Sequence, residues 1–167
     1  IEGDPLTRRL ASTAEARSAA ADPAVVSLAT DELPMAASIS RVTVFIETIA
    51  RALHAAHVAG VVHRDIKPGN IMVTPAGEPV ILDFGLSSHD AAGDSITHAG
   101  TLLGTPAYMA PEQLGSTDGV LDARVDVWAL GVVLYECLAL ARPFDGATRE
   151  QVYRAILESE PVPVRRL

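Results

Sequence analysis

The sequence of 167 residues contains a single cysteine, Cys137, and only 4% aromatic residues. One cysteine excludes an internal disulfide and a cysteine-based metal cluster, and it favours a reducing compartment. Basic residues are also scarce, and the net charge is -8. This charge argues against a nucleic-acid partner, because proteins that bind nucleic acids usually present a basic surface. The acidity names no partner by itself: it would mildly favour basic peptide substrates, but solubility is the simpler interpretation.

Long uncharged apolar runs are missing as well. The most apolar stretch, residues 125–141, contains Asp126 and Glu136 and is too short and too charged for a comfortable membrane span. No charged start followed by an apolar run opens the chain, so we expect no signal peptide, no membrane segment in this chain and a cytoplasmic location. The first residue is Ile1 rather than Met, which hints at a fragment.

An amphipathic helix is predicted over residues 40–59, where apolar side chains recur every three or four positions. Gly60 follows at a position suited to ending this helix. His54 and His57 have no third ligand at metal-binding spacing, so packed or surface histidines are the favoured interpretation of this pair.

Two further helices are predicted in the second half of the chain. Residues 125–140 are apolar on nearly all sides, which predicts a buried helix that Asp122 can cap. Residues 148–151 match a capping box. The helix that follows has one apolar face, formed by Val152, Ile156 and Leu157.

The N-terminal part of the chain has weaker signals. Residues 6–10 place two leucines one helical turn apart with two arginines between them, which predicts a short surface helix after the turn signal of residues 3–5. Residues 22–38 contain two prolines and are expected to form a connection, and residues 115–124 are expected to form a loop.

Three oxygen-bearing side chains are expected to meet near the middle of the chain. Asp65 and Asn70 lie five residues apart, and Asp83 follows a short apolar segment. Two strands, residues 71–73 and 80–82, folded back on the turn between them would bring Asp83 beside Asn70, because antiparallel strands lie ~5 Å apart. Carboxylate and amide oxygens suit Mg²⁺, which takes few protein ligands plus waters and phosphates. The sequence therefore predicts a hard-cation site next to a base.

Three motifs occur in a fixed order: residues 63–65 (His-Arg-Asp) followed by Asn70, residues 83–85 (Asp-Phe-Gly) and residues 110–112 (Ala-Pro-Glu). This set resembles the signature of the eukaryotic-type serine/threonine protein kinases. One such triplet alone would be a weak signal, but the order and spacing of all three are specific. The resemblance implies an α+β, mainly α fold: the C-terminal lobe of a protein kinase with a small catalytic β-hairpin, and without the N-terminal lobe.

The resemblance also implies phosphoryl transfer from ATP, which depends on positioning and charge neutralisation. Asp65 would orient a substrate hydroxyl and accept its proton, and Lys67 would stabilise charge on the transferred phosphoryl group. Asn70 and Asp83 would hold Mg²⁺, and Met72 would form the floor under the adenine ring.

Further residues have supporting or regulatory roles by the same resemblance. Asp126 would hydrogen-bond the backbone of residues 63–64; the alternative is that the first turn of its own helix satisfies it. A phosphate in the activation segment would pair with Arg64 and order that segment. Thr105 would hydrogen-bond near Asp65. The other implied residues are His63, Phe84, Gly85 and Glu112 in the motifs, Val133 and Cys137 below the adenine floor, and the candidate phosphorylation sites Ser95, Thr97 and Thr101, of which Thr97 is favoured by its position.

Two features of active kinases are missing from the sequence. No two glycines stand two positions apart, so there is no glycine-rich phosphate loop, and Lys67 is the only lysine. We therefore interpret residues 1–167 as a partial kinase domain, running from near the hinge between the lobes to about the helix called G in the family, with the final helices missing. We expect the isolated chain to transfer no phosphate.

The favoured function is thus the catalytic-domain portion of a serine/threonine kinase, with ATP, Mg²⁺ and a protein substrate. A pseudokinase-like binding module is the alternative, which the intact Asp65, Asn70 and Asp83 disfavour because a binding protein has no need of that trio. A small-molecule phosphotransferase is the third possibility, disfavoured by the peptide-docking pattern of residues 104–112.

Overall fold

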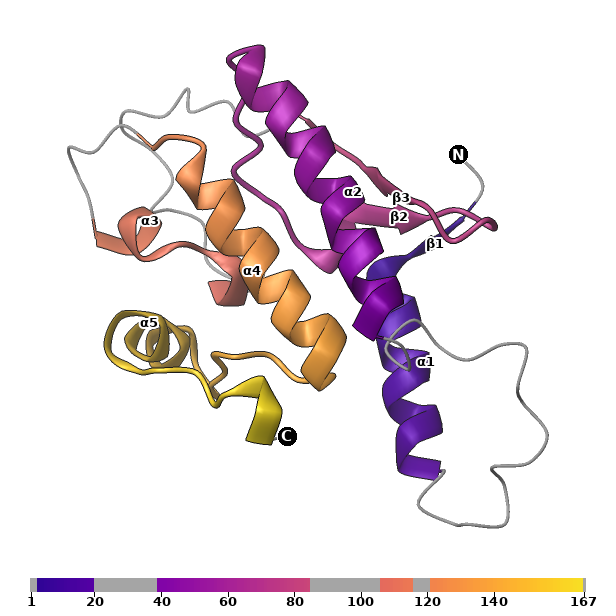
Figure 1. Cartoon of the computed structure of the whole chain (residues 1–167). Coiled ribbons are helices and arrows are strands. Elements are labelled where there is room, and N and C mark those ends of the chain that lie inside the picture. The colour runs from indigo at the N-terminus through magenta and orange to yellow at the C-terminus, as the bar shows by residue number, and fades with distance from the viewer. Residues whose placement is uncertain (1–2, 20–38, 85–105, 116–120, 167) are drawn as a thin grey trace, which may run out of the picture.

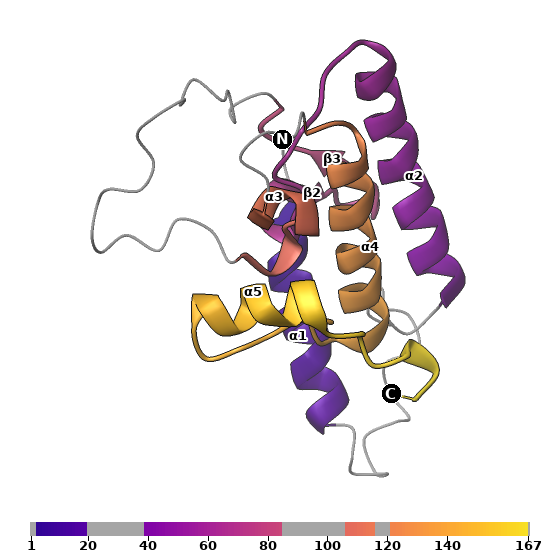
Figure 2. The same ribbon diagram turned by 90° about the vertical axis from the view of Figure 1, so that its left-hand side faces the viewer.

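The computed structural model describes residues 3–19, 39–84, 106–115 and 121–166. In these ranges the chain is mainly helical with a small antiparallel sheet, as the sequence predicts (Figure 1). Helices α2 (Ile39–Val58) and α4 (Arg124–Ala139) lie side by side at the centre in Figures 1 and 2. The sheet and α1 (Leu6–Ala19) flank α2, whereas α3 (Pro111–Gly115) and α5 (Arg149–Glu158) lie on the side of α4.

The sheet has three antiparallel strands in the order β1 (Asp4–Pro5), β2 (Ile71–Val73) and β3 (Pro79–Ile81). Ile71 opposes Ile81, so the hairpin has the predicted pairing, with β3 starting one residue earlier than expected. Gly77 closes the turn with a φ of 84°, a left-handed conformation that glycine adopts without a steric penalty.

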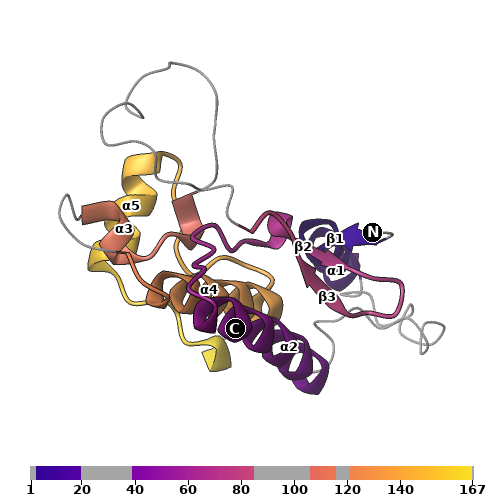
Figure 3. The same ribbon diagram turned by 90° about the horizontal axis from the view of Figure 1, so that it is seen from above.

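The main core lies where the sheet meets the two central helices, as the view from above shows (Figure 3). Ile49 of α2, Ile71 of β2 and Val133 of α4 are at most 1% exposed. A smaller cluster joins α5 to the 3₁₀ turn Pro106–Tyr108 through Phe144, which stacks on Trp128 with ring centroids 5.9 Å apart. The β2–β3 hairpin is therefore backed by apolar side chains from both helices.

Helix α2 ends at Gly60 as predicted. Gly60 has a φ of 79°, its N–H donates to the carbonyl of His57, and the N–H of Val61 donates to the carbonyl of Ala56. This pair of bonds is the Schellman arrangement, which satisfies the last carbonyls of a helix. The chain is thereby turned from α2 directly into residues 61–66.

The starts of the two later helices follow their polar residues. At α5, Thr148 Oγ1 accepts a hydrogen bond from Gln151 N at 3.3 Å, as the capping-box pattern predicts. At α4 the N-cap residue is Ala123, one residue later than expected. The carboxylate of Asp122 still accepts from Arg124 N at 2.9 Å, so it satisfies a donor at that helix start.

The N-terminal segment differs from its prediction. The predicted helix is present, but α1 has 14 residues rather than being short, and it is not a surface helix, because Leu6 and Leu10 are only 0% and 8% exposed. Asp4 and Pro5, predicted as a turn, pair with Val73 and Met72 of β2. Two leucines one helical turn apart occur in both surface helices and core helices, so this spacing does not predict burial. Leu6 and Leu10 are buried because the N-terminal segment packs against the distant strand β2.

The exposure of the later helices was also predicted too simply. Val133 of α4 is buried, but Val127 on the opposite side is 64% exposed, so the prediction that α4 is buried all round is wrong. In α5 Leu157 is 53% exposed, and the apolar face consists of Val152 and Ile156. The number of apolar residues in a helix does not determine how much of its surface is covered by other elements, so the exposure of individual side chains could not be predicted from it.

Among the helices that the structure describes, none combines the length and the apolarity that a bilayer crossing requires.

Candidate active site

Asp126, in the first turn of α4, is fully buried and joins three parts of the chain. Its Oδ1 accepts from the backbone N of Arg64 at 2.7 Å, and its Oδ2 accepts from the backbone N of His63 at 2.8 Å and from His57 Nε2 at 2.7 Å. A buried carboxylate is tolerated only with such donors. The contact to residues 63–64 is the one implied by the resemblance, and it fixes this loop to α4.

Arg64 has a strained backbone at the point where Asp126 holds it. Its φ of 68° lies in the left-handed region, which costs a residue other than glycine about 1–3 kcal/mol. Asp126 binds its N–H, and Gln113 Nε2 of α3 donates to its carbonyl oxygen at 3.3 Å. The Arg64 Nε is buried without a hydrogen-bond partner among the described residues. The loop is thus held on both sides while that guanidinium nitrogen is left unsatisfied.

His63 connects the same loop to the chain after β3. Its Nε2 lies 2.8 Å from the carbonyl oxygen of Leu82, and because a carbonyl only accepts, Nε2 carries the hydrogen. Nδ1 then accepts from Asp65 N at 3.3 Å. The ring also meets Phe84 edge-on, with centroids 4.9 Å apart and planes at 68°. His63 thereby orients both the Asp65 turn and the residues that follow Leu82.

Asp65, Lys67 and Asn70 form one polar cluster. Lys67 Nζ lies 2.7 Å from Asp65 Oδ2, and Asn70 Nδ2 donates to the same oxygen at 2.9 Å and to the Asp65 carbonyl at 2.8 Å. The Asp65 side chain is 50% exposed, and its Oδ1 forms no hydrogen bond with the part of the chain that the structure describes. One carboxylate oxygen is thus held in place, and the other is uncommitted within the described residues.

Asp83 lies next to this cluster along the hairpin. Leu82 N donates to the Asn70 carbonyl at 2.8 Å, which continues the β2–β3 pairing by one step and places residue 83 just beyond Asn70. Asp83 is exposed, has a φ of 60° and makes no side-chain hydrogen bond or ion pair within the described ranges. The hairpin therefore brings the predicted residues 70 and 83 to the same end of the sheet.

These oxygens fit a magnesium ion. Asn70 uses its Nδ2 toward Asp65, which leaves its Oδ1 for a cation, and the Asp83 carboxylate is uncommitted within the described residues. No group of three or more His, Cys, Asp or Glu side chains able to hold a metal occurs in residues 3–19, 39–84, 106–115 or 121–166. A site with few protein ligands is the kind that Mg²⁺ occupies, since it completes its coordination with waters and substrate phosphates.

Met72 occupies the middle of β2 on the face that the core does not use. Its neighbours Ile71 and Val73 are fully buried in the main cluster with Val133 and Cys137, whereas Met72 is half-buried. Successive strand residues point to opposite faces, so Met72 points away from that cluster. This is compatible with a floor for a planar ring, supported from below by α4.

Some predicted residues cannot be located here. Gly85, Thr105 and the candidate phosphorylation sites Ser95, Thr97 and Thr101 lie outside the described residues. Glu112 lies on α3, exposed, beside a cavity of about 600 Å³ that Arg124 and Trp128 also line.

Sequence reasoning gave no individual role to three polar side chains, of which His57 and Gln113 contact the site. His57 was interpreted as a packed or surface residue, yet it binds Asp126, and Gln113 was not singled out. The available signal was Asp126 itself, since an acidic residue in an apolar helix needs donors from elsewhere. Tyr108 donates its hydroxyl to Glu136 Oε2 at 2.6 Å. Burial, aided by this bond to Glu136, raises the pKa of Tyr108 well above its usual range, so the hydroxyl stays a donor.

Comparison with known proteins agrees with these motifs. Residues 27–165 match the family model described as "Protein kinase domain". The chain is 45% identical over 115 residues to the DNA damage-responsive serine/threonine-protein kinase RqkA of Deinococcus radiodurans, covering 68% of this chain and 17% of that protein. It is 43% identical over 120 residues to the serine/threonine-protein kinase PknA of Mycobacterium tuberculosis, covering 71% of this chain and 27% of that protein. PknL of the same species is 46% identical over 105 residues, which cover 63% of this chain and 26% of PknL. The aligned region thus spans only a sixth to about a quarter of these relatives.

Proposed function

Because this chain belongs to the protein kinase family, we propose that it forms part of the catalytic domain of a serine/threonine protein kinase. In the complete protein, the γ-phosphate of ATP is transferred to a serine or threonine hydroxyl of a protein substrate, at a cytoplasmic location. The proposal for the isolated chain is that it transfers no phosphate, since neither a glycine-rich loop nor a second lysine is present to clamp the nucleotide.

The observation that supports this proposal best is the Asp126 contact with the loop. Asp126 holds the strained Arg64 backbone, and the chain then leads directly into Asp65, Lys67 and Asn70, which share hydrogen bonds. A protein that only binds a nucleotide has no need for a positioned carboxylate with one oxygen open. The positioned carboxylate therefore favours catalysis in the complete protein over the binding-module alternative.

Each residue has a separate task in the transfer. Lys67 and Asn70 bind Asp65 Oδ2 and so hold the carboxylate in position. Its Oδ1 then orients the substrate hydroxyl for attack on the phosphorus and accepts the hydroxyl proton. Lys67 lies beside Asp65 and neutralises negative charge on the transferred group. Asn70 and Asp83 would hold Mg²⁺, which supplies positive charge to the phosphate oxygens when bound. Met72 contributes an apolar surface for the adenine.

Arg64 has a regulatory role in this proposal. Its Nε is buried and unsatisfied among the described residues, and a phosphate on Ser95, Thr97 or Thr101 would supply an acceptor. Those hydroxyls lie outside the described residues, so their assignment rests on the sequence. Phosphopeptide mapping of the active protein is expected to find one of them, with Thr97 favoured; a fully active protein without phosphate at all three positions would contradict it.

The test of the proposed function is transfer of radiolabelled γ-phosphate from ATP to an acceptor protein by the full-length protein. We expect label on serine or threonine that requires Mg²⁺ and disappears with EDTA. Label on tyrosine, label that persists without a divalent cation, or no transfer at all would overturn the proposal. The same assay on residues 1–167 alone is expected to show no label.

A further inference from the structure

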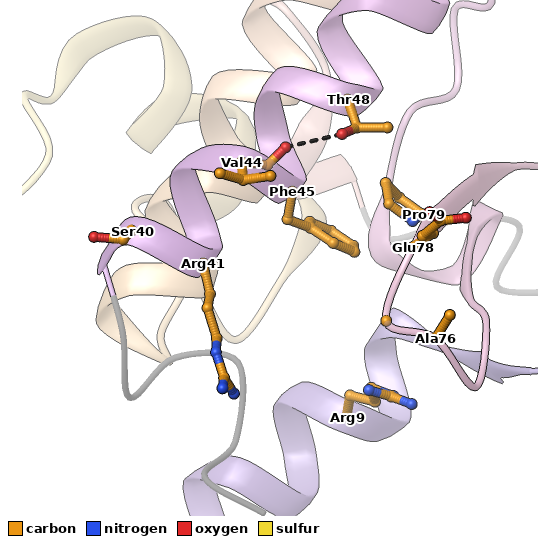
Figure 4. A pocket seen from close by; sticks show the side chains of 10 residues that line it. Arg9, Ser40, Arg41, Val44, Phe45, Thr48, Ala76, Glu78 and Pro79 are labelled. Carbon is orange, nitrogen blue, oxygen red and sulfur yellow. Dashed lines mark hydrogen bonds between the residues drawn. The ribbon is translucent and has the colours of Figure 1, made fainter.

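A cavity of about 830 Å³ lies between α1, the N-terminal half of α2 and the β2–β3 turn (Figure 4). We call it the α1–α2 groove and define it by Arg9 of α1, by Arg41, Val44, Phe45 and Thr48 of α2, and by Pro79 of β3. The catalytic residues are at the other end of the hairpin, because β2 leads from Asn70 toward the turn that borders the groove. A three-residue strand spans ~10 Å, so an occupant of the groove leaves the catalytic loop open.

The groove carries two positive charges that pair with no acidic side chain in the part of the chain that the structure describes. Neither Arg9 nor Arg41 forms an ion pair with a residue in the described ranges, and in Figure 4 Arg41 extends from α2 toward the helix that carries Arg9. The neighbouring arginines of the same helices differ: Arg8 pairs with Asp4 at 2.6 Å, and Arg51 pairs with Glu47 at 2.7 Å. Both of these paired arginines lie outside the groove.

Apolar side chains lie beside these charges. Val44 is 63% exposed and Phe45 is buried beneath it, so the wall on α2 offers a hydrocarbon surface rather than a polar one. Thr48 does not change this, because its Oγ1 donates to the carbonyl of Val44 at 2.9 Å in its own helix (Figure 4). Among the described residues of the groove, positive charge is therefore offered by Arg9 and Arg41.

Charge decides which kind of segment fits. The chain as a whole has a net charge of -8, so an acidic segment is repelled by most of its surface and attracted to the two guanidinium groups. Guanidinium groups also match carboxylates in geometry, since they donate two parallel hydrogen bonds. Among the described residues that line the cavity, Glu78 is the one acidic side chain, and because Arg9 and Arg41 outnumber it, these described residues carry an excess of positive charge. A basic segment is disfavoured there.

We propose that the α1–α2 groove docks a segment of the protein substrate in which acidic residues flank an apolar side chain. The carboxylates bind Arg9 and Arg41, and the apolar side chain contacts Val44 and Pro79. Naming the partner as a substrate rests on the proposed function, whereas the chemistry of the segment rests on the groove alone. Docking at this distance from Asp65 selects substrates without contacting the reacting atoms.

The test measures peptide binding to the full-length protein without ATP, by fluorescence anisotropy. The probes are fluorescein-labelled nine-residue peptides with glutamates on both sides of a leucine–phenylalanine pair, and matched peptides with lysine in place of glutamate. We expect the glutamate peptides to bind and the double variant R9E/R41E to weaken that binding at least tenfold. The control R8E/R51E changes the same helices outside the groove and is expected to alter binding less than threefold.

Three results would overturn the inference: no binding of the glutamate peptides, equal binding of the lysine peptides, or equal losses in R9E/R41E and R8E/R51E. Binding that appears only after Asp31 and Glu32 are changed to serine would also overturn it, because the chain's own acidic residues would then be the occupant. Normal phosphate transfer with no peptide binding rejects the groove and leaves the proposed function standing. Charge-dependent peptide binding without any phosphate transfer rejects the proposed function instead.

Discussion

Asp126 Oδ2 and His57 Nε2 lie 2.7 Å apart, although the two residues are separated by 69 positions in the sequence. The same carboxylate accepts the backbone N–H groups of His63 and Arg64, so one buried side chain joins α2, α4 and the loop that carries Asp65. The structure of the candidate active site depends on this junction more than on any contact within the loop itself.

Replacing Asp126 with alanine is expected to destabilise the loop by about 3–5 kcal/mol, because buried donors lose their acceptor. Asp126→Asn should cost less, about 1–3 kcal/mol, since the amide keeps one accepting oxygen. Hydrogen exchange followed by mass spectrometry on peptides covering residues 61–66 measures the change. The control is alanine at the exposed Asp145, which should leave protection in these peptides unchanged. A D126A protein that retains wild-type protection against exchange in these peptides would contradict the role given to Asp126.

Replacing Asp65 with asparagine is expected to lower phosphate transfer by about 10²–10⁴-fold, the usual contribution of a general base, without unfolding the protein. An amide keeps the size of the side chain and can still accept from Lys67 and Asn70, but it does not take up the substrate proton. Transfer rates of the full-length protein and its circular dichroism spectrum test both parts. Turnover at the wild-type rate would remove Asp65 from this role.

Asp83→Asn is expected to raise the Mg²⁺ concentration needed for half-maximal transfer at least tenfold. A neutral amide oxygen attracts a divalent cation less than a carboxylate does. Titration of the transfer rate with Mg²⁺ measures this, and D145N, an exposed change elsewhere, should titrate like the wild type. An unchanged midpoint in D83N would show that Asp83 does not hold the ion.

Gly3 and Gly131 are expected to respond oppositely to alanine. A Cβ on Gly3 would lie 2.5 Å from the carbonyl oxygen of Val73, which forces β1 away from β2 at a cost of about 1–3 kcal/mol. A Cβ on Gly131 meets nothing within 4 Å, and alanine in a helix is favoured over glycine by up to about 1 kcal/mol. Thermal unfolding of both variants measures the two signs. A stabilised G3A protein would be inconsistent with the β1–β2 contact.

Stability is expected to fall in alkaline solution because of Cys137. Burial, with a smaller contribution from Glu136, raises the pKa of the Cys137 thiol from 9.0 to about 12. Between these values the unfolded chain has lost the proton and the folded chain keeps it, so the free energy of unfolding decreases by about 1.4 kcal/mol per pH unit. Urea unfolding across this window checks the slope. In the variant C137A, the free energy of unfolding should fall less steeply with pH, because the thiol contribution is absent. The same pH dependence in C137A and in the wild type would contradict this role of Cys137.

Local patterns were enough to predict part of this structure. The periodicity of residues 40–59 and Gly60 gave α2 nearly to the residue, and the turn between two short apolar segments gave the antiparallel hairpin, although its second strand lies one residue earlier than predicted. The predicted hairpin also places Asp83 beside Asn70, at the same end of the sheet. In both cases the structure is determined by interactions between residues that are close in the sequence or that face each other across one turn.

Contacts between distant segments were not predictable in the same way. The burial of Leu6 depends on β2, the exposure of Val127 depends on what covers α4, and the role of His57 depends on Asp126. The sequence around Leu6, Val127 or His57 contains no periodic pattern that identifies these distant partners. A buried acid inside an apolar helix indicates that donors are required, but it does not say which residues provide them.

The left-handed backbone of Arg64 has a consequence for how the protein is made. The side chain that stabilises this conformation belongs to residue 126, which leaves the ribosome long after the loop does. Until α4 has been synthesised, the His63 and Arg64 amides lack the acceptor that they have in the folded chain, so we expect the loop to relax to a conformation without positive φ. The loop geometry around Asp65 is therefore expected to form late, after α4 has been synthesised, and a nascent chain that stops before this helix is expected to contain the His-Arg-Asp motif without this arrangement.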